Sequence, residues 1–137
     1  MDNQIIIVCD EEGKLTGEYI AKEKGHLGKG QRHLAITVLL FNNQGQVLLQ
    51  KRKHKVFDDI WDLTGATHPL HLKNDHDETF EEATLRCLKR EYGIEAEEVK
   101  NLKNLGVFNY FAECKDGLCE HEAQPLLCEN EHCAMLT

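Results

Sequence analysis

Two histidines and a pair of glutamates are the residues of this sequence whose types and spacing most directly suggest chemistry. His26 and His33 stand seven residues apart, on either side of a Gly-rich segment. Imidazole is a common ligand of divalent metals, but loop histidines are also often exposed to solvent, so the spacing leaves both interpretations open. Glu120 and Glu122 stand two apart in a segment expected to be a strand, and this spacing directs both carboxylates to one face.

A run of basic residues, K-R-K-H-K at positions 51–55, is a second candidate site. Most such runs are solvated strand ends. In a chain with 24 acidic and 16 basic residues this run stands out, and basic side chains hold a diphosphate by charge-assisted hydrogen bonds. The segment that follows, residues 61–69, places His68 in a loop just before a proline. His71 and His76, in the polar loop after it, are expected to be exposed rather than ligands.

Four of the six cysteines form the pattern C-x4-C-x8-C-x4-C near the end of the sequence. Four thiolates could bind a structural zinc ion, although gaps of four residues lie at the loose end of the usual spacing. Both pairs interrupt segments that read as strands, so reduced cysteines in strands and turns are the favoured interpretation. The four residues are Cys114, Cys119, Cys128 and Cys133.

Several strands are expected to position these residues. Short β-rich runs cover residues 4–9 and 15–20, and a nearly continuous apolar run over 33–41 predicts a strand buried on both faces. The turn N-N-Q-G at 42–45 predicts a hairpin whose second strand, 46–52, returns antiparallel. With the helix described next, these strands predict an α/β or α+β fold.

One helix is predicted over residues 78–92. Apolar residues recur at i, i+3, i+7 and i+8 from Phe80, which is the period of an amphipathic helix. Acidic residues fill the first turn and basic residues the last, as the helix dipole favours, and Gly93 is expected to end the helix. An aromatic strand is predicted over 105–112, beyond the helix.

Composition excludes several classes of function. The chain has 137 residues, the size of one domain with a substantial core. The formal net charge of −8 argues against nucleic-acid or membrane-surface binding. The longest apolar run, 35–41, is too short to span a bilayer, and no signal peptide is readable. We therefore expect a cytoplasmic protein with reduced cysteines.

The helical segment resembles the Nudix box, whose pattern is G-x5-E-x7-R-E-U-x-E-E-x-G-U with U aliphatic. Glu78, Arg86 and Glu91 match the pattern, and the G-I pair at 93–94 matches its end. The resemblance implies the Nudix fold, an α/β/α sandwich with a mixed β-sheet, as a single domain over residues 1–137. The departures are Cys87 and Arg90 in place of two glutamates, and a spacing from Gly65 to Glu78 that is longer than in the box.

One branch of the superfamily, the isopentenyl-diphosphate isomerases, departs from the box in a similar way. The T-H-P that follows Trp61 looks like the corresponding loop of that branch. The family continues beyond the position of Thr137, with a stretch that supplies a tryptophan to the hydrocarbon pocket. The C-terminal part is therefore expected to be short, or the pocket to be completed by a second protomer in a homodimer.

The resemblance to the isomerases also implies a site for a small-molecule diphosphate. Glu122 is the implied acid, Tyr110 polarises it, and Glu91 binds a second cation together with the diphosphate. The expected metal is Mg²⁺, with Mn²⁺ or Zn²⁺ as alternatives at the His/Glu site. Glu129 and Glu131 have the spacing of the preferred glutamate pair and stay open as an alternative. The implied metal ligands are His26, His33, His68, Glu120 and Glu122, and the implied diphosphate contacts are Lys22, Arg52 and Lys55.

The main departure from the isomerases is Ala66, which stands where they carry a catalytic cysteine. Isomerisation delivers a proton to one carbon and removes another from the opposite face, and a thiol suits this because its pKa lies near neutrality. A methyl group exchanges no proton. The hydroxyls of Thr64 and Thr67 are far weaker acids and could only orient a water. We therefore expect isomerase activity that is weak or absent.

Two other functions stay open. A Nudix hydrolase would cleave a nucleoside or prenyl diphosphate, with Glu78 and Glu91 binding Mg²⁺. A protein without catalysis would bind a diphosphate, or a structural zinc ion, as an interaction module.

Overall fold

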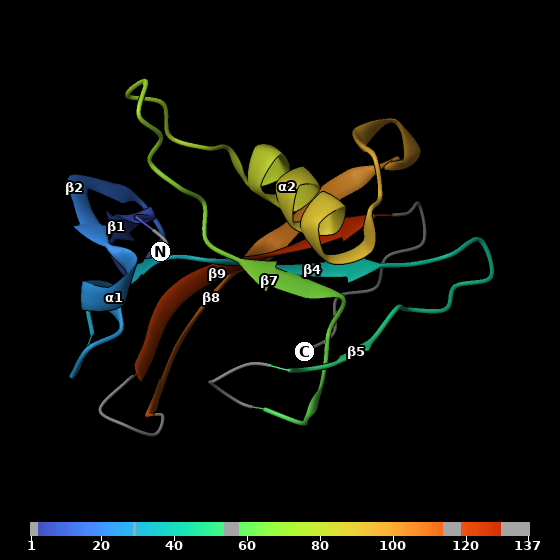
Figure 1. Ribbon diagram of the computed structural model, residues 1–137, viewed down its shortest axis with the longest axis horizontal. Helices are drawn as coiled ribbons and strands as arrows, with labels where there is room; N and C mark the ends of the chain where they lie inside the picture. Colours follow the sequence, from blue (N-terminus) through green and yellow to red (C-terminus); the bar gives the residue numbers. More distant parts are fainter. Residues whose placement is uncertain (1–2, 29, 54–57, 114–118, 130–137) are drawn as a thin grey trace.

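The computed structural model describes residues 3–28, 30–53, 58–113 and 119–129, and over 107–113 and 119–129 it describes the backbone alone (Figure 1). These residues form a seven-stranded sheet in the order β2-β1-β3-β9-β4-β7, with β8 paired to β9, and a separate ribbon of β5 and β6. The strands are β1 Ile5–Cys9, β2 Leu15–Ala21, β3 His33–Leu34, β4 Ile36–Leu40, β5 Gln50–Lys51, β6 Trp61–Asp62, β7 Gly65–Thr67, β8 Leu102–Glu113 and β9 Cys119–Glu129. The helices are α1 Lys22–Gly25, α2 Phe80–Tyr92 and the short 3-10 helix η1 Ala96–Glu98.

The apolar segment that was predicted to be a doubly buried strand lies at the centre of the sheet as β3 and β4. Every residue from 33 to 39 is buried, which confirms the prediction. β9 runs parallel to both strands, while β1 pairs antiparallel with β3 and β7 antiparallel with β4. The sheet is therefore mixed, as expected.

The turn after β4 forms as predicted, but its return strand does not. Asn42 accepts hydrogen bonds on its side-chain oxygen from the backbone N–H groups of Gln44 and Gln46, both at 2.9 Å. Beyond the turn, pairing with β4 is limited to the bridge between Phe41 and Val47 and to the bond from the Leu48 N–H to the Leu40 carbonyl. The reason is that β7 and β9 already occupy the edges of β4, so β5 pairs with β6 instead.

The predicted helix is present and begins two residues later than expected, at Phe80. Thr79 is its N-cap: its hydroxyl accepts a hydrogen bond from the Glu82 N–H at 3.1 Å, and the Glu82 carboxylate accepts one from the Thr79 N–H at 3.2 Å. This capping box satisfies two N–H groups that a helix start leaves unpaired. Gly93 ends the helix with φ of 67°, a left-handed conformation that glycine adopts without steric cost.

Helix α2 covers one face of the sheet (Figure 1). Its Ala83 and Leu88 form a buried cluster with Ile36 and Val38 of β4. Because side chains alternate along a strand, Thr37 lies on the opposite face. Among the described residues no second long helix covers that opposite face, and no helix is long and apolar enough to cross a membrane.

The course of β9 bears on the proposed zinc site. Cys119 is the first residue of this strand and Cys128 its last but one, so about 30 Å of extended chain separates them. Thiolates that share a zinc ion each lie about 2.3 Å from it. Cys119 and Cys128 therefore cannot bind the same ion in this fold, and the possible four-cysteine zinc site is contradicted. Cys114 and Cys133 lie outside the described residues.

Candidate metal centre

Three histidines from distant parts of the sequence converge beside β1. His26 follows α1, His33 begins β3 and His68 follows β7. Their potential ligand nitrogens all lie within 4.8 Å of one another. The ring centroids are 4.7, 5.0 and 5.1 Å apart, and His33 is completely buried while the other two are partly buried. The three histidines that the resemblance implied are therefore together in space.

The Nδ1 atom of each imidazole faces a backbone carbonyl. The distance from Nδ1 to oxygen is 2.7 Å from His26 to Lys22, 2.7 Å from His33 to Gln31 and 3.4 Å from His68 to Leu34. A carbonyl only accepts hydrogen bonds, so these contacts favour the tautomer with the proton on Nδ1 and the lone pair on Nε2. Metal-binding histidines are commonly oriented in this way. The donor set thus fits a divalent metal.

Strand β1 supports all three histidine segments. The Lys22 N–H, at the start of α1, donates to the Gln4 carbonyl next to β1 at 3.0 Å, and Val8 pairs with His33. The His71 N–H, three residues after His68, donates to the Ile5 carbonyl at 2.9 Å.

Gly25 allows the close approach of α1 to β1. A Cβ at Gly25 would lie 2.7 Å from Cδ1 of the fully buried Ile6 and 3.6 Å from Nδ1 of His33. A larger residue would therefore push α1, and His26 with it, away from the other two histidines.

An ion pair holds the loop that carries His68. Arg86 binds Glu78 through two bonds of 2.9 Å, from Nε to Oε2 and from Nη2 to Oε1, and it also donates from Nη2 to the His68 carbonyl at 2.8 Å. Glu78 accepts a further bond from the Leu70 N–H at 2.9 Å, and its side chain is only 6% exposed. Glu78 therefore serves as a structural residue, which weakens the assignment of this glutamate to Mg²⁺ in the hydrolase hypothesis.

Ala66 is exposed on β7 and pairs in register with Thr37, on the face opposite α2. The expectation that Thr64 and Thr67 orient a water there is not supported. Thr64 is completely buried, and its hydroxyl donates to the Leu48 carbonyl at 2.6 Å and accepts from the Leu40 N–H at 2.8 Å. Thr67 accepts a bond from Arg86 at 3.4 Å. Strand alternation places Thr67 on the other side from Ala66, whereas Thr64 lies just before the first residue of β7.

Cys87 does not take the place of the missing thiol. It is buried on α2 beneath β7, with its Sγ 3.9 Å from the Ala66 carbonyl oxygen, and a Cβ at Gly65 would lie only 2.9 Å from that sulfur. Burial raises the pKa of the Cys87 thiol. A thiol with a raised pKa on the far side of the strand is a packing residue rather than an acid for the open face.

The backbone register brings the proposed acid next to the histidines. Glu122 of β9 pairs with His33 of β3 on one side and with Tyr110 of β8 on the other, so the three residues lie abreast on adjacent strands. Glu120 lies two residues earlier on the same strand, paired with Ala112.

The alternative glutamate pair lies far from the histidines along the sheet. Glu129 pairs with Leu40, about 23 Å along β9 from Glu122. Glu131 lies outside the described residues. The register therefore favours Glu120 and Glu122.

The residues implied for the diphosphate are only partly placed. Lys22 begins α1, one turn before His26, with its ammonium 3.4 Å from the Gln4 side-chain oxygen. Arg52 pairs with Asp62 across the β5–β6 ribbon at 3.0 Å. Lys55 lies outside the described residues. Glu91 is exposed near the end of α2, 3.2 Å from Arg90, and is not among the metal-ligating side chains that the described structure brings together.

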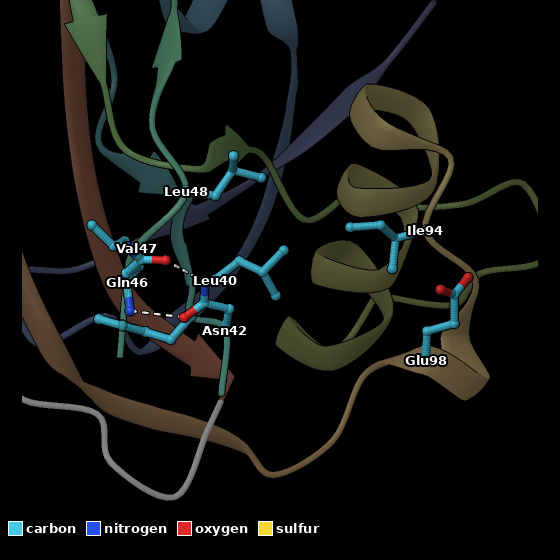
Figure 2. A pocket seen from close by; sticks show the side chains of 8 residues that line it. Leu40, Asn42, Gln46, Val47, Leu48, Ile94 and Glu98 are labelled. Atoms are coloured by element: carbon cyan, nitrogen blue, oxygen red, sulfur yellow. Dashed lines mark hydrogen bonds between the residues drawn. The ribbon is translucent and has the colours of Figure 1, made fainter. Parts of the chain in front are cut away.

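A hollow of about 600 Å³ lies elsewhere in the molecule (Figure 2). It opens between the turn after β4 and the segment that follows α2, and none of the three histidines lines it. Figure 2 shows Glu98 at its edge, and among the described residues it is the one charged side chain that lines the hollow. This lining offers no chemistry for a diphosphate, so the hollow is not the candidate active site. The lining residues are Leu40, Phe41, Asn42, Gln46, Val47, Leu48, Ile94 and Glu98.

The family model described as the NUDIX domain matches residues 31–132, and this chain belongs to that family. Among curated proteins it is 32% identical to an isopentenyl-diphosphate delta-isomerase of Gibberella zeae, over 91% of this chain and 55% of the relative. It is 32% identical to that of Pectobacterium atrosepticum, over 85% and 60%, and 35% identical to that of Halobacterium salinarum, over 78% and 48%. The chain therefore spans about half to two thirds of the length of these relatives.

A crystal structure of a Deinococcus radiodurans protein is similar to this fold, with a TM-score of 0.63 at 16% identity, over 95% of this chain and 74% of the other. These comparisons confirm the α/β Nudix fold and the resemblance to the isomerase branch.

Proposed function

We propose that this protein is a divalent-metal-dependent enzyme that acts on isopentenyl or dimethylallyl diphosphate, with isomerisation that is weak or lost. The observation that carries the proposal is the convergence of His26, His33 and His68 within 4.8 Å, in register with Glu122. Three neutral imidazoles with one or two carboxylates form a donor set suited to Zn²⁺ or Mn²⁺, and Mg²⁺ suits a diphosphate and a carboxylate such as Glu91.

In this proposal Glu120 and Glu122 complete the histidine site. Residues paired on neighbouring strands share a face of the sheet, so the register supports Glu122 and Tyr110 on the face that carries His33. Glu122 then gives a proton to the substrate from one side, and Tyr110 polarises it by a hydrogen bond. A bound metal would supply positive charge that holds the carboxylates of Glu120 and Glu122 at the histidine site.

On the opposite side of the substrate, Ala66 stands in the place of the group that would remove a proton. Ala66 is exposed two residues before His68, where proton removal would occur, and its methyl group cannot accept a proton. General acid–base groups contribute about 10²–10⁴-fold to a rate, so this loss accounts for the weak isomerisation that we propose. Lys22, Arg52 and Lys55 would hold the diphosphate. The cytoplasmic location, the single domain and the homodimer stay predictions.

Replacing His33 by alanine should lower the affinity for Zn²⁺ at least 100-fold, because one of three converging nitrogens is lost from a buried position. Isothermal titration of the apo protein with Zn²⁺ and Mn²⁺ measures this. The control is His76→Ala, which removes an exposed imidazole that binds Glu82 at 2.9 Å outside the cluster. Equal affinities for the two variants would contradict the metal site.

Family membership and the exposed Glu91 support the hydrolase hypothesis as an alternative. Phosphorus and proton NMR of isopentenyl diphosphate in D2O distinguishes it from the proposed function. We expect slow deuterium exchange or dimethylallyl product, and no release of phosphate. Hydrolysis that is abolished by Glu91→Gln but survives His26→Ala would establish the hydrolase instead. A protein that binds the diphosphate without any exchange, even after prolonged incubation, would be a non-catalytic binding module.

A further inference from the structure

A cluster of three side chains joins β2 to the loop between His68 and α2. The Tyr19 hydroxyl donates to one oxygen of Asp77 at 3.0 Å, and Nδ1 of His71 lies 2.6 Å from the other. The rings of Tyr19 and His71 stack, with centroids 3.9 Å apart and planes inclined at 29°. We call these three residues the β2 clamp. His71 was expected to be exposed, but its side chain is only 20% exposed.

A second carboxylate lies beside the β2 clamp. Nε2 of His71 lies 3.4 Å from a carboxylate oxygen of Asp75, so each ring nitrogen of His71 faces a carboxylate. The hydrogen bond to Asp77 raises the pKa of Tyr19, which keeps its hydroxyl a donor. Ring stacking and the two contacts to Asp77 thus act at one point.

The β2 clamp acts close to the metal ligand His68. Only Pro69 and Leu70 separate His68 from His71, and both are buried. Leu70 forms a bridge with Ile6 of β1, so the chain from His68 to His71 lies against the same hairpin that supports His26 and His33. A shift of the backbone at His71 would therefore reach His68 through only two residues.

We propose that Tyr19, His71 and Asp77 are positioning residues for the metal centre, which hold His68 where its imidazole meets those of His26 and His33. The inference rests on the metal site of the proposed function. None of the three binds the metal. They act through the backbone of the loop, and losing such supporting residues typically lowers metal affinity by about 10–100-fold.

The test measures Zn²⁺ affinity by isothermal titration and records the visible spectrum of the Co²⁺ form, which reports the number and geometry of the ligands. The first variant is Tyr19→Phe, which removes the hydrogen bond to Asp77 and keeps the stacked ring. The second is His71→Gln, which removes the ring that stacks on Tyr19 and contacts Asp77. The matched control is His76→Gln, because His76 lies in the same loop but pairs with Glu82 of α2 rather than with β2. We expect a loss of 10–100-fold for His71→Gln, a smaller loss for Tyr19→Phe, and less than a twofold change for the control.

A merely structural role for the β2 clamp predicts a different pattern. His71→Gln would then lower the melting temperature but leave the Zn²⁺ affinity and the Co²⁺ spectrum of the folded protein unchanged, and this result would overturn the inference. If His71→Gln fails to fold, Tyr19→Phe decides the question by the same two measurements. Failure of the wild-type protein to bind Zn²⁺, Mn²⁺ or Co²⁺ would refute the proposed metal centre itself, and the inference with it.

Discussion

Replacing Ala66 by cysteine is expected to raise the rate of isopentenyl diphosphate isomerisation by about 10²-fold or more, the lower end of what a positioned general acid or base contributes. Ala66 is exposed on β7, so a thiol can be added without displacing a packed neighbour. It lies two residues before His68, the proposed metal ligand, and pairs with Thr37 on the face opposite α2. The measurement is the initial rate of dimethylallyl diphosphate formation, followed by proton NMR in D2O.

The matched control is Ala66→Ser, which adds a side chain of nearly the same size whose hydroxyl is a far weaker acid than a thiol. Its rate should stay close to that of the natural sequence. Cys87 is present in all three proteins, so any reaction of that buried thiol contributes equally. An Ala66→Cys protein that folds and binds metal, but gains no rate over Ala66→Ser, would count against an isomerase site.

Local features of the fold could be predicted because nearby residues determine them. The period of apolar residues and Gly93 identified α2, and the missed start at Phe80 was also readable, since Thr79 and Glu82 have the spacing of a capping box. The buried strand predicted over 33–41 followed from its nearly continuous apolar sequence. The prediction of a return strand after the turn was wrong, because β7 and β9 occupy the edges of β4. Such long-range pairing leaves little trace in the local sequence.

The candidate site shows the same difference between local features, which could be predicted, and long-range contacts, which could not. Spacing alone left His26 and His33 ambiguous, because their approach to His68 depends on β1 pairing with β3 and contacting the loop after β7. The resemblance to the isomerases supplied what the spacing could not. It could not supply the role of His71, since the loop that carries it is longer than the spacing of the Nudix box allows, and its contact with Tyr19 joins residues 52 positions apart.

Replacing Arg86 by methionine is expected to lower the free energy of unfolding by about 3 kcal/mol, the cost of leaving a buried charge without its partner. The Glu78 side chain is only 6% exposed, whereas that of Arg86 is 29% exposed, so the glutamate is the residue that depends more on the pair. The variant also loses the bond from Nη2 to the His68 carbonyl. Unfolding in urea, followed by circular dichroism, measures the change.

The double variant Glu78→Gln with Arg86→Met separates the cost of the unpaired Glu78 charge from the loss of the bond to the His68 carbonyl. A neutral glutamine can still accept the bond from the Leu70 N–H, so the double variant should be more stable than Arg86→Met alone, by about 1–2 kcal/mol, although it has one more substitution. Arg86→Met should also lower the Zn²⁺ affinity, and the double variant should not restore it, because the His68 carbonyl still lacks its donor. A double variant less stable than Arg86→Met would mean that Glu78 stabilises the loop without Arg86, and recovery of Zn²⁺ affinity would mean that the arginine does not position His68.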